Sequence, residues 1–295
     1  MPLVLKHPIA LFIITMSAAA LVGCGSGHKM TDPSSSKAGS ATVSAVHDRS
    51  AQSDAEDSED AAIGITAPAT ITQPGVYRLL EDATITHGDG IHITASHVRL
   101  LLGRHLLTGP GDKSGRAVVV DGASDVLVRG GQIRRFGIGV ALLDASNCRV
   151  RGVSIEGGDA TADPANGNPP QIGMMLVNSA HDVIARNTID AINLGLFVRG
   201  GGSTDNLLLG NTVTGAKHGL LGICYNPAPT GGAAGPYDDV VRENVLSRFG
   251  TGISTSAGSQ NNYFVGNTLQ FFDAPWVDKN GSNVFERNRT EQVAR

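Results

Sequence analysis

The chain has 295 residues and a formal net charge of −4 at pH 7, with 23 Lys and Arg against 27 Asp and Glu. The basic residues are scattered and give no footprint for nucleic acid, so a nucleic-acid partner is not expected. Once the N-terminal segments are set aside, about 230 residues remain, enough for one domain with a sizeable core.

Residues 1–23 have the features of a bacterial signal peptide. Lys6 and His7 precede an apolar run, "IALFIITMSAAALVG", that is too short for a permanent membrane-spanning helix. The run ends in "LVGC", which resembles a lipobox and implies cleavage before Cys24 and lipidation of its thiol. Several acyl chains on one residue give stable anchoring. Gly25 follows where lipoproteins of the inner membrane often carry Asp, so the resemblance implies an outer-membrane lipoprotein, facing the periplasm or the cell surface. The alternative is a plain secretory signal.

Residues 24–62 are predicted to be the lipidated cysteine and a disordered tether. They are rich in Ser, Ala and Asp and hold almost no large apolar side chains. Such a segment cannot bury enough surface to offset its ordering entropy. The folded domain is therefore expected over residues 63–295.

From residue 63 onward the sequence shows an internal repeat, with a shortest repeat length of about two dozen residues. Eight segments align: "SHVRLLLG", "SDVLVRGG", "SNCRVRGV", "HDVIARNT", "DNLLLGNT", "DDVVRENV", "NNYFVGNT" and "SNVFERNR". Ahead of most of them lies a Gly or Ala followed by alternating apolar residues, and a short apolar pair follows each. Three short strands per turn predict an all-β fold, a single-stranded right-handed parallel β-helix of about eight coils.

Asparagine recurs four residues after the hydrophobic position of the aligned segment in five successive turns. Stacked side-chain amides can bond the coils above and below them, so we predict a structural ladder. Its members are Asn187, Asn211, Asn244, Asn267 and Asn288.

Three stretches carry a resemblance to a known family: "ITQPGVYRLLEDATI", "DGIHITASHVRLLLGRHLLTG" and "VRGGQIRRFGIGVALLDASNCRV". They resemble the opening coils of bacterial right-handed parallel β-helix repeat proteins of the pectate-lyase-like superfamily. The resemblance covers residues 63–290 and implies the fold. It says almost nothing about activity, because this fold hosts lyases, hydrolases, epimerases and non-catalytic binders.

In that superfamily, substrates usually lie along the outer face of the first strand of each coil. If Gly or Ala begins that strand and the faces alternate, the outward residues form a mostly apolar stripe. Either the loops at 157–171 and 225–238 cover this stripe, or it is a groove for a sugar, peptide or lipid. The stripe consists of His92, Val119, Ala141, Met175, Phe197, Leu221 and Ser254.

Asp121, Asp144 and Arg199 fall at the end of the same strand in different coils and are the candidate catalytic residues. Neighbouring coils lie about 5 Å apart, and two carboxylates at that separation suit a glycosidase. One Asp would be the acid and the other the base or nucleophile, while Arg199 would hold a carboxylate or developing negative charge. The same residues equally suit turns, as do Asp238 and Asp239, which we interpret as turn residues that open a strand.

Three functions follow as hypotheses. The first is a non-catalytic envelope protein, expected to be a monomer, that binds polysaccharide or a protein partner. The second is a polysaccharide lyase or glycosidase, and the third an accessory protein for periplasmic metal-enzyme maturation, which some β-helix repeat proteins are.

We predict no metal site and no cofactor, with Ca²⁺ considered only for a lyase. Cys148 and Cys224 are expected about 14 Å apart, hence as free thiols, both buried.

Overall fold

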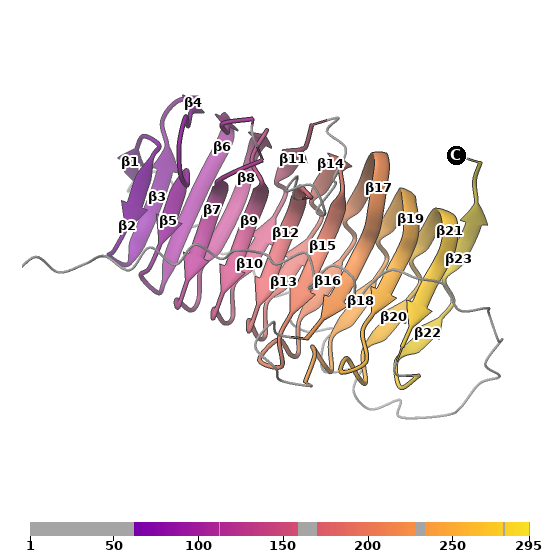
Figure 1. Cartoon of the computed structure of the whole chain (residues 1–295). Coiled ribbons are helices and arrows are strands. Elements are labelled where there is room, and N and C mark those ends of the chain that lie inside the picture. The colour runs from indigo at the N-terminus through magenta and orange to yellow at the C-terminus, as the bar shows by residue number, and fades with distance from the viewer. Residues whose placement is uncertain (1–61, 112, 159–169, 228–233, 280, 295) are drawn as a thin grey trace, which may run out of the picture.

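The computed structural model describes residues 62–111, 113–158, 170–227, 234–279 and 281–294. Every element in these ranges is a β-strand, and all paired strands are parallel. Within these ranges there is no helix long and apolar enough to cross a membrane. The strands stack along one axis, with the first coils at one end and the C-terminal strands at the other (Figure 1).

The strands form three sheets, and we call the sheet that contains β2 the first, the sheet that follows it along each coil the second, and the remaining one the third. The first sheet holds β2 (Ala69–Ile71), β5 (Ile91–Ile93), β7 (Arg116–Asp121), β9 (Ile138–Leu143), β12 (Ile172–Val177), β15 (Leu194–Arg199) and the later parts of β17 (Thr212–Asn226), β19 (Val245–Thr255) and β21 (Thr268–Asp278).

The second sheet holds β1 (Ile63–Ile65), β3 (Gly75–Leu79), the first parts of β6 (Val98–Thr108) and β8 (Leu127–Arg134), then β10 (Arg149–Arg151), β13 (Val183–Ala185), β16 (Leu207–Leu209), β18 (Val240–Arg242), β20 (Tyr263–Val265) and β22 (Val284–Glu286). The third holds β4 (Ala83–Thr84), the remaining parts of β6, β8, β17, β19 and β21, and β11 (Ser154–Glu156), β14 (Thr188–Ile192) and β23 (Arg289–Gln292). This arrangement is the predicted parallel β-helix.

The glycine at the start of several first-sheet strands is required by the stacking of the coils. A Cβ atom on Gly195 would lie 2.3 Å from the carbonyl oxygen of Gly222 in the next coil, and one on Gly173 would lie 2.7 Å from that of Gly195. Contacts that short do not occur, so at these two positions only glycine, which has no Cβ, lets the backbones approach. The recurring glycine of the sequence is therefore a packing feature.

The predicted asparagine ladder is confirmed. Asn211 donates through Nδ2 to Asn244 Oδ1 at 2.9 Å and to the Ile184 carbonyl at 2.8 Å, while its Oδ1 accepts from Asn187 Nδ2 at 3.0 Å. The same pattern continues through Asn244, Asn267 and Asn288. Each amide side chain makes the hydrogen bonds that backbone groups at this buried corner of the coil would otherwise make to water.

A second, unpredicted ladder lies at the corner before the second sheet. Its oxygens accept backbone N–H groups from the preceding coil: Asp239 Oδ1 accepts from Asn206 at 2.7 Å, and Asn262 Oδ1 from Asp239 at 3.0 Å. Asp239, interpreted from the sequence as a turn residue that opens a strand, stands directly before β18, and its side chain is fully buried. Asp238 does occupy a turn, with a φ of 58°. The ladder consists of Asp182, Asn206, Asp239, Asn262 and Asn283.

Burial raises the pKa of Asp239 to about 8 and that of Asp182 to about 6. The Tyr225 hydroxyl lies beside Asp239 inside the coil, yet neither that hydroxyl nor Asp239 Oδ2 has a well-aligned hydrogen bond. Asp239 is therefore held in its neutral, protonated form near pH 7.

Cys148 and Cys224 are both free and buried, as expected. They lie on opposite sides of the wall. Cys148 belongs to the interior core, where burial raises the pKa of its thiol to about 12, whereas Cys224 belongs to an outer apolar cluster.

The C-terminal end of the core is closed by aromatic rings. Phe285 stacks on Phe264 with 4.7 Å between ring centroids, and Trp276 stacks on Phe285 at 5.1 Å. Phe264 is fully buried, and the other two pack against the interior cluster. These rings shield the last coil, whose sheet edges have no further strand to cover them among the described residues.

Candidate functional site

The outer face of the first sheet carries the residues that the sequence singled out. His92, Val119, Ala141, Met175, Phe197 and Ser254 form one column in register across successive coils. Leu221 was wrongly placed in it: Cys224 occupies that position, between Phe197 and Ser254. The segment "GLLGIC" holds two glycines, and the second one begins the strand because β17 takes up extra residues before it. Leu221 pairs with Leu194 in the neighbouring outward column.

Most of this stripe is shielded from solvent. Val119, Ala141 and Ser254 expose none of their surface, and Phe197 and Met175 expose 3% and 7%. They pack in a cluster separate from the interior core, together with Ile172, Leu194, Leu221 and Cys224. The loops predicted to cover the stripe include 159–169 and 228–233, which lie outside the described residues.

The proposed catalytic trio is not brought together. Asp121 is in register with Leu143 of the next coil, and Asp144 is the residue after Leu143. Arg199 is in the same column as Asp121 but three coils away from it. Asp144 has a φ of 47° and accepts from Asn178 Nδ2 at 3.2 Å, which is the geometry of a turn residue. The expected pair of stacked carboxylates, Asp121 beside Asp144, is therefore wrong. The cause is the turn after the strand, which begins one residue later than the alignment assumed.

Arg199 lies on the apolar stripe, largely buried. Its guanidinium carbon sits 5.9 Å from the centroid of the Phe197 ring, and Nε donates to the Pro227 carbonyl at 3.3 Å. Desolvation lowers the pKa of Arg199, while the nearby Cys224 acts in the opposite direction. Its described contacts suit holding the stripe together rather than assisting a reaction at Asp121.

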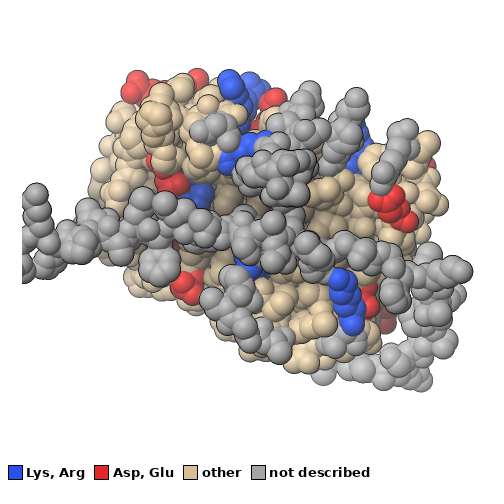
Figure 2. Space-filling model, viewed as in Figure 1, with Lys and Arg blue, Asp and Glu red and all other residues tan. Residues whose placement is uncertain are grey.

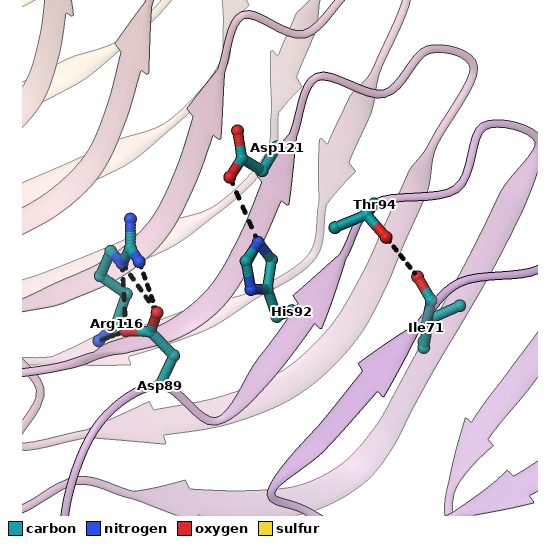
Figure 3. A network of polar contacts seen from close by, with 6 residues as sticks. All are labelled: Ile71, Asp89, His92, Thr94, Arg116 and Asp121. Atoms are coloured by element: carbon teal, nitrogen blue, oxygen red, sulfur yellow. Dashed lines mark hydrogen bonds and ion pairs between the residues drawn. The ribbon is translucent and has the colours of Figure 1, made fainter. Parts of the chain in front are cut away.

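At the N-terminal end of the first-sheet face, four partly exposed polar side chains on β5 and β7 and the segments that lead into them form two pairs (Figure 3). His92 Nε2 lies 3.4 Å from Asp121 Oδ2, and their side chains are 32% and 48% exposed. Beside them, Arg116 holds Asp89 through Nε at 3.0 Å and through Nη2, and its backbone N–H also donates to Asp89 at 2.9 Å. We call Asp89, His92, Arg116 and Asp121 the polar cluster.

The sequence contained an unused signal for half of this cluster. Asp89 directly precedes Gly90, and Arg116 directly precedes Ala117. These are the small residues that begin consecutive first-sheet strands, so stacking the motifs places the two charges side by side. His92 and Asp121 were both named, but they were assigned to different sites.

The polar cluster can donate and accept hydrogen bonds from fixed positions. Asp89 and Arg116 satisfy each other in a fork geometry, which holds both side chains still. The imidazole of His92 beside the carboxylate of Asp121 can donate a hydrogen bond or move a proton. Over the described residues, no group of three or more His, Cys, Asp or Glu is placed to hold a metal ion. On the face seen in Figure 2, charged side chains form small groups on a mostly uncharged surface.

Comparisons with known proteins agree with this architecture. The family described as "Right handed beta helix region" matches residues 71–269, more than half of the chain. No curated protein matches the chain. Among solved structures, the alginate lyase from Paenibacillus sp. str. FPU-7 is similar over 77% of this chain and 98% of its own, with 14% identity and a TM-score of 0.54. The tailspike protein of E. coli bacteriophage HK620, solved with a pentasaccharide, is similar over 85% of this chain and 53% of its own, with 14% identity and a TM-score of 0.44.

Proposed function

We propose that this protein, which belongs to the right-handed β-helix family, binds a polysaccharide at the open end of its first-sheet face without cleaving it. The observation that carries the proposal is the polar cluster: it is partly exposed on neighbouring coils, while the rest of the outward stripe is buried.

The chemistry of the cluster suits sugar hydroxyl groups. Arg116 offers donors, and Asp89 and Asp121 offer acceptors; the hydrogen bonds between Arg116 and Asp89 fix that pair before a ligand arrives, and His92 lies 3.4 Å from Asp121 with its Nε2 buried. Sugar hydroxyl groups can both donate and accept, so they could replace hydrogen bonds that these side chains make in the free protein, with little net loss of hydrogen bonding. The long, shallow wall of stacked strands also accommodates a chain molecule better than a compact one.

Binding is favoured over cleavage by the positions of the carboxylates. A glycosidase uses two carboxyl groups on either side of the bond that breaks. Asp89 is engaged by Arg116, and Asp144 is in a turn of the following coil, which leaves Asp121 without a matching partner in the cluster. A second candidate rests on the His92–Asp121 contact, since an imidazole held by a carboxylate can abstract a proton, as a polysaccharide lyase requires.

One assay separates these functions. The soluble protein is incubated with plant and bacterial polysaccharides, and binding and chain length are followed in the same samples. We expect retention of at least one glycan at full length, with affinity at least tenfold weaker for His92→Ala and Asp121→Ala. Asp144→Ala, an exposed carboxylate outside the cluster, is the matched control and should bind as the unmodified protein does. Shortened chains or new unsaturated ends that disappear in His92→Ala would instead identify a lyase.

We also propose that the domain is held at the outer membrane by lipid on Cys24. The support is the sequence "LVGC" after a short apolar run. Metabolic labelling with an alkyne fatty acid should mark the protein, and Cys24→Ser should abolish the label. Equal labelling of both forms would show that the lipid is not on this residue.

A further inference from the structure

Aliphatic side chains follow the polar cluster along the outer face of the first sheet. Leu143 of β9 is in register with Asp121, and Val177 of β12 is in register with Leu143. At the other end of the same strands, Ile138 is in register with Arg116. Neighbouring coils lie about 4.8 Å apart, so Asp121, Leu143 and Val177 form a row about 10 Å long. We call Ile138, Leu143 and Val177 the aliphatic rim.

The aliphatic rim keeps part of its surface accessible. All three of its side chains are partly exposed, whereas Val119 and Ala141, which lie in the column between its two sides, expose none of their surface. The rim packs against the outer apolar cluster, which holds its side chains in place. Beyond Val177 the row ends at Arg199, which is only 7% exposed. The accessible apolar surface is therefore short and adjoins the polar cluster.

The rim is aliphatic and not aromatic. The strands β5, β7, β9 and β12 contain no Phe, Tyr or Trp. A flat aromatic ring packs well on the flat apolar face of a sugar ring, whereas branched aliphatic side chains make their best contacts with small convex groups such as methyl groups. These strands therefore suit methyl groups on a sugar better than the bare sugar ring.

The same four strands offer no unpaired cation for an acidic sugar. Arg116 is the one Lys or Arg on β5, β7, β9 and β12, and Asp89 holds its guanidinium group through Nε and Nη2. Asp121 adds a carboxylate that is 48% exposed. Protonation of His92 would only balance that charge. A sugar carboxylate placed beside Asp121 would be repelled, so the charges favour a neutral sugar.

We propose that the polysaccharide bound at the polar cluster is neutral and carries methyl groups, as acetyl groups or 6-deoxy carbons, that pack on the aliphatic rim. This inference rests on the polysaccharide binding proposed above. Hydroxyl groups of the chain bond to Arg116 and Asp121, and methyl groups one or two coils further along lie against Leu143 and Val177. Each methyl group is removed from water on binding, which favours the methyl-bearing chain over the same chain without it.

Two matched pairs of glycans test this with the soluble protein. Acetylated glucomannan is compared with the same sample after mild alkaline removal of its acetyl groups. D-Rhamnan is compared with a mannan of the same linkage, because rhamnose is 6-deoxymannose. Isothermal titration calorimetry measures the affinities. In at least one pair we expect the methyl-bearing chain to bind about fivefold more tightly or better, and polygalacturonate to bind more weakly than that chain.

A substitution in the rim locates the contact. Leu143→Asn replaces two methyl groups by an amide of similar size, and it should reduce the preference within the discriminating pair to less than about twofold. Leu80→Asn, the same exchange at a leucine that is 56% exposed and lies outside the first sheet, should keep the full preference. Circular dichroism checks that both variants are folded.

The other outcomes separate this inference from the proposed function. Equal affinities within both pairs would contradict the methyl contact and leave polysaccharide binding standing. Tighter binding of polygalacturonate than of all four neutral chains would contradict the preference for a neutral sugar. If none of the five glycans binds, the proposed function fails and this inference fails with it. Should Leu143→Asn not fold, the comparison of matched glycans on the unmodified protein still decides.

Discussion

Asp239 is a carboxylic acid in a position where its ladder neighbours, Asn206 and Asn262, carry amides. In the folded protein burial raises its pKa to about 8, whereas in the unfolded chain it titrates near 3.9. The folded state then binds the proton more tightly than the unfolded state does. The contribution of Asp239 to stability is therefore largest below about pH 4, falls as pH rises to about 8, and is constant above that.

Replacing Asp239 by Asn should remove this dependence. We expect Asp239→Asn to be more stable than the unmodified protein at pH 8 to 9, on the order of a few kcal/mol, and to differ much less at pH 4. Urea unfolding at several pH values measures the difference, and Asp238→Asn, the adjacent turn residue, is the control. A difference that stays constant between pH 4 and pH 9 would show that Asp239 titrates normally.

Phe197 was expected from the sequence to touch a ligand, and its burial leads to a different prediction. With 3% of its surface exposed, Phe197→Ala should cost about 3–5 kcal/mol in the free energy of unfolding, because a cavity opens in the outer cluster. Leu80→Ala, at a side chain 56% exposed, should cost far less. If Phe197→Ala keeps its stability but loses glycan binding, the stripe and not the polar cluster is the ligand face.

Features repeated over many coils could be predicted from the sequence, whereas the positions of single side chains could not. The repeat and the asparagine ladder were predictable because equivalent residues recur at the same position in many coils. Misaligning one coil therefore does not change the pattern. Asp121, Asp144 and Leu221 depend on single turn lengths. One residue more or less, or a second glycine as in "GLLGIC", moves a side chain to another column or face.

At the scale of single elements, the asparagine ladder stabilises the corner between the second and third sheets. Asn211 makes contacts to the coil on each side, through Asn187 and Asn244, and all of these groups are buried. Asn211→Ala should destabilise the protein by about 3 kcal/mol or more, because it leaves several buried backbone and amide groups without partners. Thermal and urea unfolding measure the loss. Thr212→Ala, the exposed next residue, should change stability by less than about 0.5 kcal/mol; a similar loss in both variants would remove the special role of the amide.

At the scale of the whole molecule, the solenoid is nearly one-dimensional. Each coil contacts mainly its two neighbours, so stability is a sum of local terms and a change at one end need not reach the other. The candidate binding cluster lies in the first coils and the aromatic cap in the last, so function and C-terminal stability should be separable.

Phe285→Ala tests this separation. The substitution removes the ring that stacks between Phe264 and Trp276, and the last coil then loses most of its apolar cover. We expect faster hydrogen exchange in β20 to β23, by tenfold or more, and unchanged exchange in β5, β7 and β9. Glycan binding at the polar cluster should also be unchanged. Exchange that accelerates equally along the whole chain would mean that the coils unfold as one cooperative unit. A ligand bound at His92 and Asp121 should then slow hydrogen exchange in the C-terminal strands as strongly as in β5 and β7.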